Sequence, residues 1–161
     1  MVAYHPSDTI PMSSFEFAWR ITNAQWSLLP DKVLSCIKPL TPSKSSELLQ
    51  KSPFGGTVDQ LFDPGRYHAT RQVSLEGESN SEKQRVKKWF RELPVPANQE
   101  IYLCWQVDDG VAAVTDWPTF TEVWDDLWYP FDRLCAFDET RQWAVLLGPE
   151  ERAVFIEHHA R

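Results

Sequence analysis

Apolar and polar positions alternate in several short segments of the second half of the chain, and period-two alternation predicts β-strands. Residues 100–107 and 110–115 are two such segments, and the residues that join them, Asp108-Asp109-Gly110, are typical of a hairpin turn. Three more predicted strands close the chain, at residues 133–138, 142–148 and 152–158. Near the front, residues 14–21 place Phe15, Phe17, Trp19 and Ile21 at every second position, which predicts a first strand.

Apolar residues spaced by three and four predict helices between these strands. The first predicted helix begins at Pro30 and ends by Pro39. The second begins at Thr41-Pro42, because threonine is a suitable N-cap and proline a suitable first helical residue.

Two further helices have aromatic faces. Residues 81–93 form an amphipathic helix whose apolar side consists of Val86, Trp89, Phe90 and Leu93. Another helix begins at Trp117-Pro118, with Asp116 as its N-cap. Its aromatic stripe consists of Trp117, Phe120, Trp124 and Trp128.

The remaining segments are predicted to form loops. Residues 52–80 are rich in turn-forming residues, and we expect a mobile, irregular flap with Leu61, Phe62 and Tyr67 docked on the core. Residues 1–13 predict a flexible tail, and residues 14–161 a single domain. The elements together predict an α+β fold, in which an antiparallel β-meander packs against several helices in a single pair of layers.

Charge is distributed unevenly along this pattern. Residues 1–99 contain 12 basic and 10 acidic side chains, whereas residues 100–161 contain 4 and 13. Residues 92–132 contain nine acidic side chains and no lysine or arginine. We therefore expect an acidic surface, which disfavours a nucleic-acid partner. The basic residues of the predicted helix 81–93 either face water or pair with this acidic half.

Candidate catalytic residues are few. Cys104 and Cys135 lie in apolar segments, where a reduced cysteine packs as a small hydrophobic residue. His158-His159 lacks a further ligand at a suitable spacing, and no nucleophile is identifiable beside His68. We expect no catalytic residue, metal or cofactor. An enzyme whose carboxylates converge with His68 or a cysteine, and a self-associating scaffold, are the alternatives left open.

The N-terminus lacks the pattern of a signal peptide, and no apolar stretch is long enough for a membrane helix. With three widely spaced cysteines and no disulfide or zinc pattern, the sequence predicts a reduced, cytoplasmic protein without a membrane partner.

The sequence DLWYPF at residues 126–131, followed by DRLCAFD at 132–138 and WAVLL at 143–147, resembles the C-terminal part of small bacterial immunity proteins. Such proteins neutralise the toxins of polymorphic or contact-dependent growth inhibition systems. Their pattern often has two acids after Tyr-Pro, whereas this chain has Phe131-Asp132-Arg133. The resemblance implies a cytoplasmic protein that binds one cognate toxin and blocks its active site. The sequence leaves the oligomeric state open, and a monomer is favoured.

A toxin that acts on nucleic acid carries a basic cleft, which an acidic inhibitor can bind rapidly. On this hypothesis the docking face consists of acids on the hairpin turn and the last helix, with two tryptophans as anchors. The expected partner-binding residues are Asp108, Asp109, Asp125, Asp126, Asp132, Trp105 and Trp128.

Overall fold

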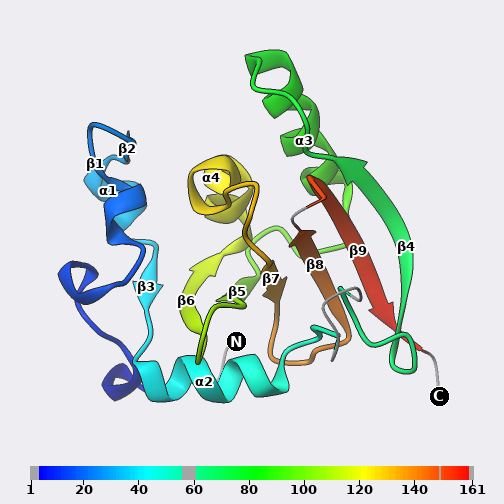
Figure 1. Ribbon diagram of the computed structural model, residues 1–161, viewed down its shortest axis with the longest axis horizontal. Helices are drawn as coiled ribbons and strands as arrows, with labels where there is room; N and C mark the ends of the chain where they lie inside the picture. Colours follow the sequence, from blue (N-terminus) through cyan, green and yellow to red (C-terminus); the bar gives the residue numbers. More distant parts are fainter. Residues whose placement is uncertain (1–3, 56–60, 149, 160–161) are drawn as a thin grey trace.

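A seven-stranded antiparallel sheet forms the centre of the protein in the computed structural model, which describes residues 4–55, 61–148 and 150–159. Figure 1 shows the sheet with its strands in the order β3-β6-β5-β7-β8-β9-β4. The strands in that order are β3 (Lys38–Pro39), β6 (Val111–Asp116), β5 (Glu100–Trp105), β7 (Leu134–Phe137), β8 (Trp143–Gly148), β9 (Arg152–His158) and β4 (Tyr67–Ser74). A separate small hairpin joins β1 (Thr22–Asn23) and β2 (Ser27–Leu28).

Helices lie on both faces of the sheet. They are α1 (Asp31–Leu34), α2 (Pro42–Lys51), α3 (Asn80–Glu92) and α4 (Trp117–Leu127). Successive residues of β5 point to opposite faces, so Leu103 and Trp105 join a core with α3 and α4, whereas Tyr102 and Cys104 join a second core with α2. The predicted α+β class is confirmed, and the second covered face adds a layer to the expected pair.

Capping residues fix the starts of the three longer helices. Thr41 Oγ1 accepts a hydrogen bond from Lys44 N (3.2 Å) at α2, and Asp116 Oδ1 accepts one from Thr119 N (2.8 Å) at α4. Ser79 and Glu82 form a capping box at α3. The two N-caps expected from the sequence are confirmed, and α3 buries the predicted face around Val86 and Phe90.

The predicted strand at residues 14–21 is wrong. This segment contains the 3-10 turns η2 (Met12–Ser14) and η3 (Ala18–Arg20), whose hydrogen bonds include Arg20 N to Phe17 O (3.1 Å). Phe15 and Ile21 are buried as the alternation suggested, but Trp19 is exposed. The alternation therefore predicted burial at the two ends of this segment only, and not the backbone conformation, because tight turns satisfy this backbone locally.

The expectation of an irregular flap at residues 52–80 is wrong for its second half, and residues 56–60 lie outside the described residues. β4 occupies that half and pairs along its whole length with β9. The sequence concealed this strand because β4 is polar: it lies at the edge of the sheet and is exposed at most positions. Tyr67 is buried and Leu61 and Phe62 pack on the second core, as expected.

The front of the chain differs from the prediction in two further ways. α1 ends at Leu34, and Pro39 belongs to the short edge strand β3 that pairs with β6, so the first helix is shorter than expected. Residues 4–13, expected within a flexible tail, include the 3-10 turn η1 (Pro6–Asp8) and a β-bridge from Thr9 to Leu40. Residues 1–3 of that tail are not described. None of the helices in the described part of the chain has the length and apolar character needed to cross a membrane.

Candidate functional site

A compact turn at residues 128–132 follows α4 and presents one phenylalanine to solvent. Asp132 N donates to Tyr129 O (2.8 Å), and Tyr129 N donates to Asp132 Oδ2 (2.9 Å), so the turn is closed from both sides. Trp128 Nε1 also donates to Asp132 O (3.2 Å). At the tip, Phe131 is 93% exposed. The 128–132 turn therefore holds a large apolar side chain in water on a well-bonded backbone.

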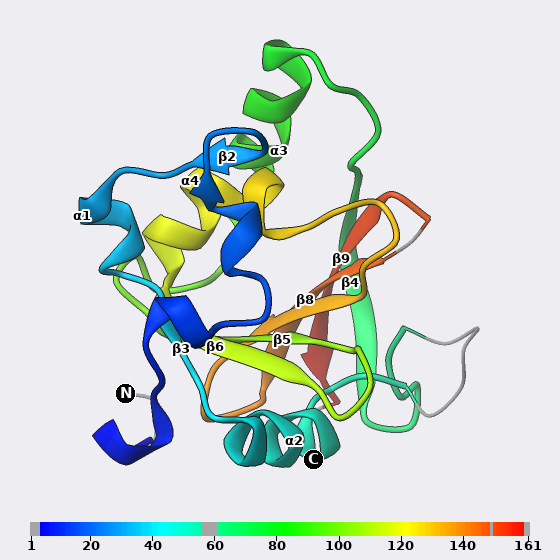
Figure 2. The ribbon, with the colours of Figure 1, turned by 60° about the vertical axis from the view of Figure 1, so that its left-hand side comes forward.

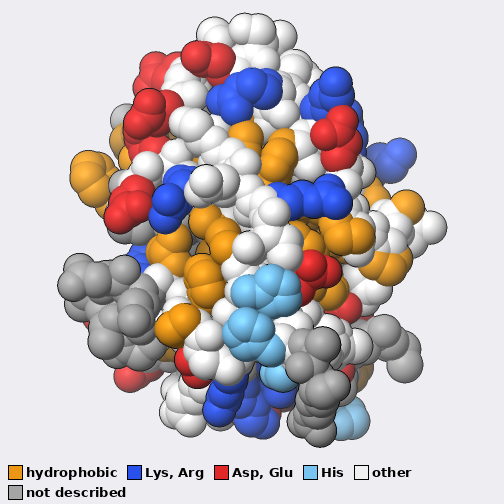
Figure 3. All heavy atoms as spheres, turned by 90° about the vertical axis from the view of Figure 1, so that its right-hand side faces the viewer, with side chains coloured by type: hydrophobic (Ala, Val, Ile, Leu, Met, Phe, Trp, Pro, Cys, Tyr) orange, Lys and Arg blue, Asp and Glu red, His pale blue; other side chains and the backbone are white. Residues whose placement is uncertain are grey.

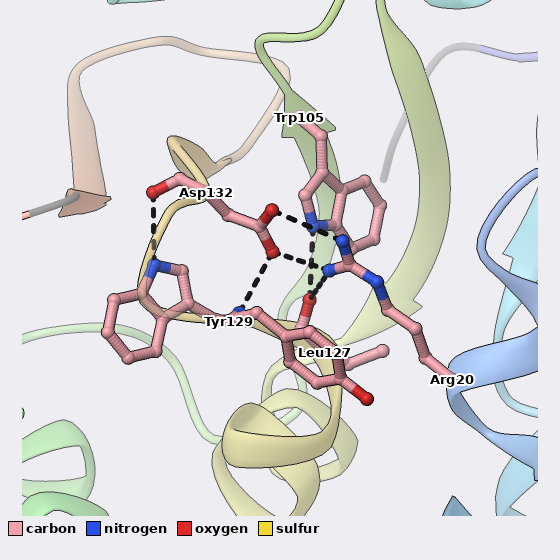
Figure 4. Close-up of polar contacts among 6 residues, drawn as sticks. Arg20, Trp105, Leu127, Tyr129 and Asp132 are labelled. Atoms are coloured by element: carbon pink, nitrogen blue, oxygen red, sulfur yellow. Dashed lines mark hydrogen bonds and ion pairs between the residues drawn. The ribbon is translucent and has the colours of Figure 1, made fainter. Parts of the chain in front are cut away.

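The turn is anchored by a buried ion pair between Arg20 and Asp132 (Figure 4). Both residues are buried, and Arg20 also donates from Nη1 to Leu127 O (3.3 Å). Trp105 Nε1 donates to the same carbonyl at 3.0 Å. The last carbonyl of α4 thus receives two donors from distant parts of the chain, which fixes the direction in which the turn leaves the helix.

Aromatic rings pack against the guanidinium group of Arg20. The guanidinium of Arg20 lies 4.0 Å from the ring centroid of Phe17 and 4.4 Å from that of Tyr129. The Trp19 ring contacts the rings of Tyr129 and Trp26, with centroids 5.8 Å and 5.4 Å away. We call Trp19, Trp26 and Tyr129 the aromatic patch; Trp26, in the β1–β2 hairpin, is 56% exposed. Leu28 of the same hairpin is also exposed.

Both predicted tryptophan anchors are wrong as surface contacts. Trp105 is 1% exposed and packs against Phe15 and Phe17, and Trp128 is 5% exposed beside Trp124. They stabilise the 128–132 turn from within the core, because their indole nitrogens donate hydrogen bonds to Leu127 O and Asp132 O.

The five predicted docking acids do not form one face. Asp108 and Asp109 are exposed at the β5–β6 hairpin, next to α2, since Gly110 lies against Ser45 and Leu49. The other three lie on the side of α3 and α4, and α2 and α3 lie at opposite ends of the molecule in Figure 1. Asp132 cannot belong to any docking face, because it is buried in its pair with Arg20.

The acids of α4 are largely neutralised by α3. Lys83 Nζ lies 3.0 Å from Asp125 Oδ2, and Glu122 is paired with Lys87 (3.1 Å) and Arg91 (3.2 Å). The hydrogen bond to Asp125 raises the pKa of Lys83, so the lysine stays charged. Of the two interpretations left open for the basic helix, pairing with the acidic half holds for Lys83, Lys87 and Arg91. These pairs remove most of the one-signed field that the sequence suggested near α4.

Asp126 is half-buried near Ser27 of the β1–β2 hairpin. Its burial raises the pKa of the carboxyl group, and a hydrogen bond from Ser27 opposes that rise. Asp126 thus connects α4 with the hairpin that carries Trp26 rather than standing free in solvent.

The groups with possible catalytic chemistry lie elsewhere. Burial raises the pKa of Cys104 to about 12 and also raises that of its cross-strand neighbour Cys135, so neither thiol is a ready nucleophile. The His68 and His159 rings stack with centroids 5.1 Å apart, and Figure 3 shows histidines together on this face. Across residues 4–55, 61–148 and 150–159, no three His, Cys, Asp or Glu side chains are grouped as metal ligands.

A further cleft, beside α3 and α4, is mainly apolar. About 600 Å³ lies between the start of α4 and the end of α3, where Trp117 and Val95 contribute apolar walls and the Arg91–Glu122 pair crosses the rim. Apart from this pair, the lining consists of threonines and apolar side chains, so the cleft offers volume without evident chemistry.

Comparison with known proteins adds no relative: no family model, no curated protein and no solved structure matches this chain. The function must therefore be argued from the residues themselves. The sequence pattern singles out the segment that carries Phe131 but gives no functional signal for Trp19 or Arg20. A signal for Trp26 was present, because its neighbours in NAQWS are polar, a setting typical of an exposed turn rather than a core.

Proposed function

We propose that this protein is an immunity protein that binds a toxin domain through the 128–132 turn and the aromatic patch. The observation that carries the proposal is Phe131, held 93% exposed at the tip of a turn whose backbone is closed by hydrogen bonds. Large aromatic side chains contribute most of the binding free energy in many protein interfaces, and a rigid anchor loses little entropy on binding.

The location of this anchor supports the same proposal. Phe131 is the last residue of the DLWYPF segment, on which the resemblance to immunity proteins rests. The partner-binding residues we now propose are Phe131, Trp26 and Trp19, supported by Arg20 and Asp132. They replace the tryptophans 105 and 128, which are buried.

Binding, rather than catalysis, fits the state of the polar groups. The Arg20–Asp132 pair holds the turn, and Glu122 and Asp125 of α4 form ion pairs with α3. The cysteines have raised pKa values in an apolar core. The features that remain accessible are apolar rings, which suit a protein surface better than a reaction centre.

The test uses the product of the neighbouring reading frame, expressed with and without this chain. We expect that product to be a secreted protein whose variable C-terminal domain arrests growth, and the present chain to restore growth and to bind the domain one to one. The double substitution Phe131→Ala/Trp26→Ala should weaken binding by about 30-fold or more, equivalent to the ~2 kcal/mol of a strong anchor. Calorimetric titration measures it.

The matched control is Asp108→Asn/Asp109→Asn, which alters the exposed acids at the opposite end of the molecule. This control should bind with unchanged affinity. If the neighbouring product is harmless, the immunity function is wrong; if the acid substitutions weaken binding and the aromatic substitutions do not, the acidic hairpin is the docking site instead.

A further inference from the structure

In the described part of the chain, the large hydrophobic side chains that are exposed lie in one region; they are Trp19, Trp26, Leu28 and Phe131. The Trp19 ring contacts the rings of both Trp26 and Tyr129. Leu28 belongs to the hairpin of Trp26, and Phe131 belongs to the turn of Tyr129. We call the aromatic patch together with Leu28 and Phe131 the apolar face.

The apolar face carries no charge of its own. It is formed by residues 17–19, 22–29 and 128–131, and these segments contain no charged side chain. Arg20 and Asp132 adjoin the face, but both are buried in their ion pair. The segments therefore lack the cations that bind the phosphates of a nucleic acid or of an anionic membrane. A second copy of the same face meets no like charge there.

The size of the face also fits a second copy. Its most exposed side chains have exposed fractions of 93% (Phe131), 63% (Leu28), 56% (Trp26) and 40% (Trp19). A large apolar side chain has about 200 Å² of surface, so these fractions correspond to roughly 500 Å² on one copy. Two copies then bury about 1,000 Å² from these side chains alone, which is the area at which specific, reversible interfaces begin.

We infer that the free protein forms a two-fold symmetric dimer through the apolar face. Every contact in such a dimer is made twice, so Phe131 of each copy packs on the partly exposed Trp19 and Trp26 of the other. Each copy thus supplies both the most exposed ring and the surface that receives it. The driving force is the removal of the apolar side chains from water.

The net charge of the chain opposes this dimer at long range. The chain carries a charge of −7 at neutral pH, and all of it lies outside the segments of the apolar face. Salt screens the repulsion between two such chains, with a Debye length of about 10 Å at 0.1 M. Self-association should therefore strengthen as salt is added, whereas a complex driven by opposite charges weakens.

The inference rests on the proposed function in one respect, because the dimer covers the residues that we propose to bind the toxin. Self-association and toxin binding are then mutually exclusive. A chain that has met no toxin keeps its exposed rings covered by a second copy, and a tightly binding toxin domain displaces that copy to leave a one-to-one complex.

Sedimentation of the full chain alone tests the dimer. We expect a monomer–dimer equilibrium with a dissociation constant on the order of 10–100 µM at about 0.3 M salt, and several-fold weaker association at about 0.02 M salt. A monomer at every concentration up to about 1 mM overturns the inference, and so does a dimer that weakens as salt is added.

Two variants with the same added charge locate the interface. Leu28→Glu brings a carboxylate from each copy into the dimer and should raise the dissociation constant by about 30-fold or more. Thr70→Glu adds the same charge on the exposed edge strand β4, outside the apolar face, and should change the constant by less than about twofold. Both positions are exposed, so both variants should unfold at the same urea concentration as the wild type. If the two variants weaken the dimer equally, or if Thr70→Glu alone does so, the apolar face is not the interface.

Addition of the toxin domain tests the competition. The dimer should give way to a one-to-one complex, and a two-to-two complex that keeps the dimer intact would contradict mutual exclusion. A failure of the dimer leaves the calorimetric test of Phe131 and Trp26 untouched, and a harmless neighbouring product leaves the sedimentation of the free chain untouched.

Discussion

The 128–132 turn and the 108–110 turn both contain aspartates that the sequence marks as acidic surface, but the fold uses them in opposite ways. At the 108–110 turn, Asp108 and Asp109 are exposed and the chain continues directly into β6. At the 128–132 turn, Asp132 is drawn into the core by Arg20, which is 112 residues away in the sequence, and Phe131 is exposed instead.

The difference shows that one cation, distant in the sequence, determines which side chain of a turn is exposed to solvent. Without Arg20, a carboxylate at position 132 would face water, because a buried unpaired charge is costly. With Arg20 in place, the aspartate accepts the Tyr129 N–H and closes the turn, and the aromatic residue is left outside. A local sequence pattern cannot distinguish these two outcomes.

The largest effect is expected from breaking the ion pair. Asp132→Asn leaves Arg20 buried without its counter-charge, which should lower the free energy of unfolding by about 3–5 kcal/mol. Urea unfolding followed by tryptophan fluorescence measures this loss. Asp108→Asn, in the exposed turn, should change stability by less than about 0.5 kcal/mol.

A double variant separates the charge from the packing. Arg20→Met/Asp132→Leu removes both charges and should recover more than half of the loss, because no buried charge is then left alone. A loss below about 1 kcal/mol in Asp132→Asn would contradict the claim that this pair holds the turn.

The 108–110 turn depends on backbone conformation rather than on charge. Gly110 has φ +95°, and a Cβ atom there would lie 3.0 Å from both Leu49 Cβ and Ser45 O. Gly110→Ala should therefore cost about 2 kcal/mol, from the left-handed backbone and the contact with α2. Gly65→Ala is the control, since the nearest atom to its Cβ is Asp63 Oδ1 at 3.1 Å, on a side chain that can move. Equal losses in the two variants, measured by urea unfolding, would show that the position of Gly110 is not special.

A smaller effect should follow from the helix that carries the 128–132 turn. Asp116→Ala removes the N-cap of α4 and should cost about 1 kcal/mol. Thr41→Ala at α2, the helix beside the 108–110 turn, is the matched cap and should cost a similar amount. If capping also sets the geometry of the turn, only Asp116→Ala should weaken partner binding, and an equal loss of binding in Thr41→Ala would contradict that link.

The sequence predicted those helices and strands whose periodicity and capping residues lie within the segment itself. The five consecutive strands β5 to β9 and the helices α2, α3 and α4 were confirmed, because apolar periodicity and caps at Thr41 and Asp116 are encoded within each segment. β4 was missed because a polar edge strand acquires its conformation from pairing with β9.

The candidate site was harder to predict, for the same physical reason. The base-free stretch at residues 92–132 suggested an acidic field, yet Lys83, Lys87 and Arg91 reach it from α3 and Arg20 from the front of the chain. Charge pairing between segments is set by the tertiary fold, and so is the burial of Trp105 and Trp128. The DLWYPF segment was the one part of the sequence that pointed to the 128–132 turn, where we propose that the partner binds.

The smallest expected effect concerns Asp126. It is half-buried near the β1–β2 hairpin, so its environment is intermediate between those of the exposed Asp108 and the buried Asp132. Burial raises the pKa of this carboxyl group in the folded state, so the folded protein binds the proton more tightly than the unfolded chain does. Its contribution to stability is then fully present below the unfolded pKa, near 3.8, and is lost as the pH rises through the folded pKa.

Asp126→Asn has no carboxyl group at this position, so its stability does not fall in this way as the pH rises. Relative to the wild type, the variant should gain stability between pH 3 and pH 7, by less than about 1 kcal/mol because half of the group is solvated. Urea unfolding at both pH values measures the difference. A relative gain that shrinks or changes sign toward pH 7 would mean that the Ser27 hydrogen bond outweighs burial, and that the β1–β2 hairpin is held by an ionised Asp126.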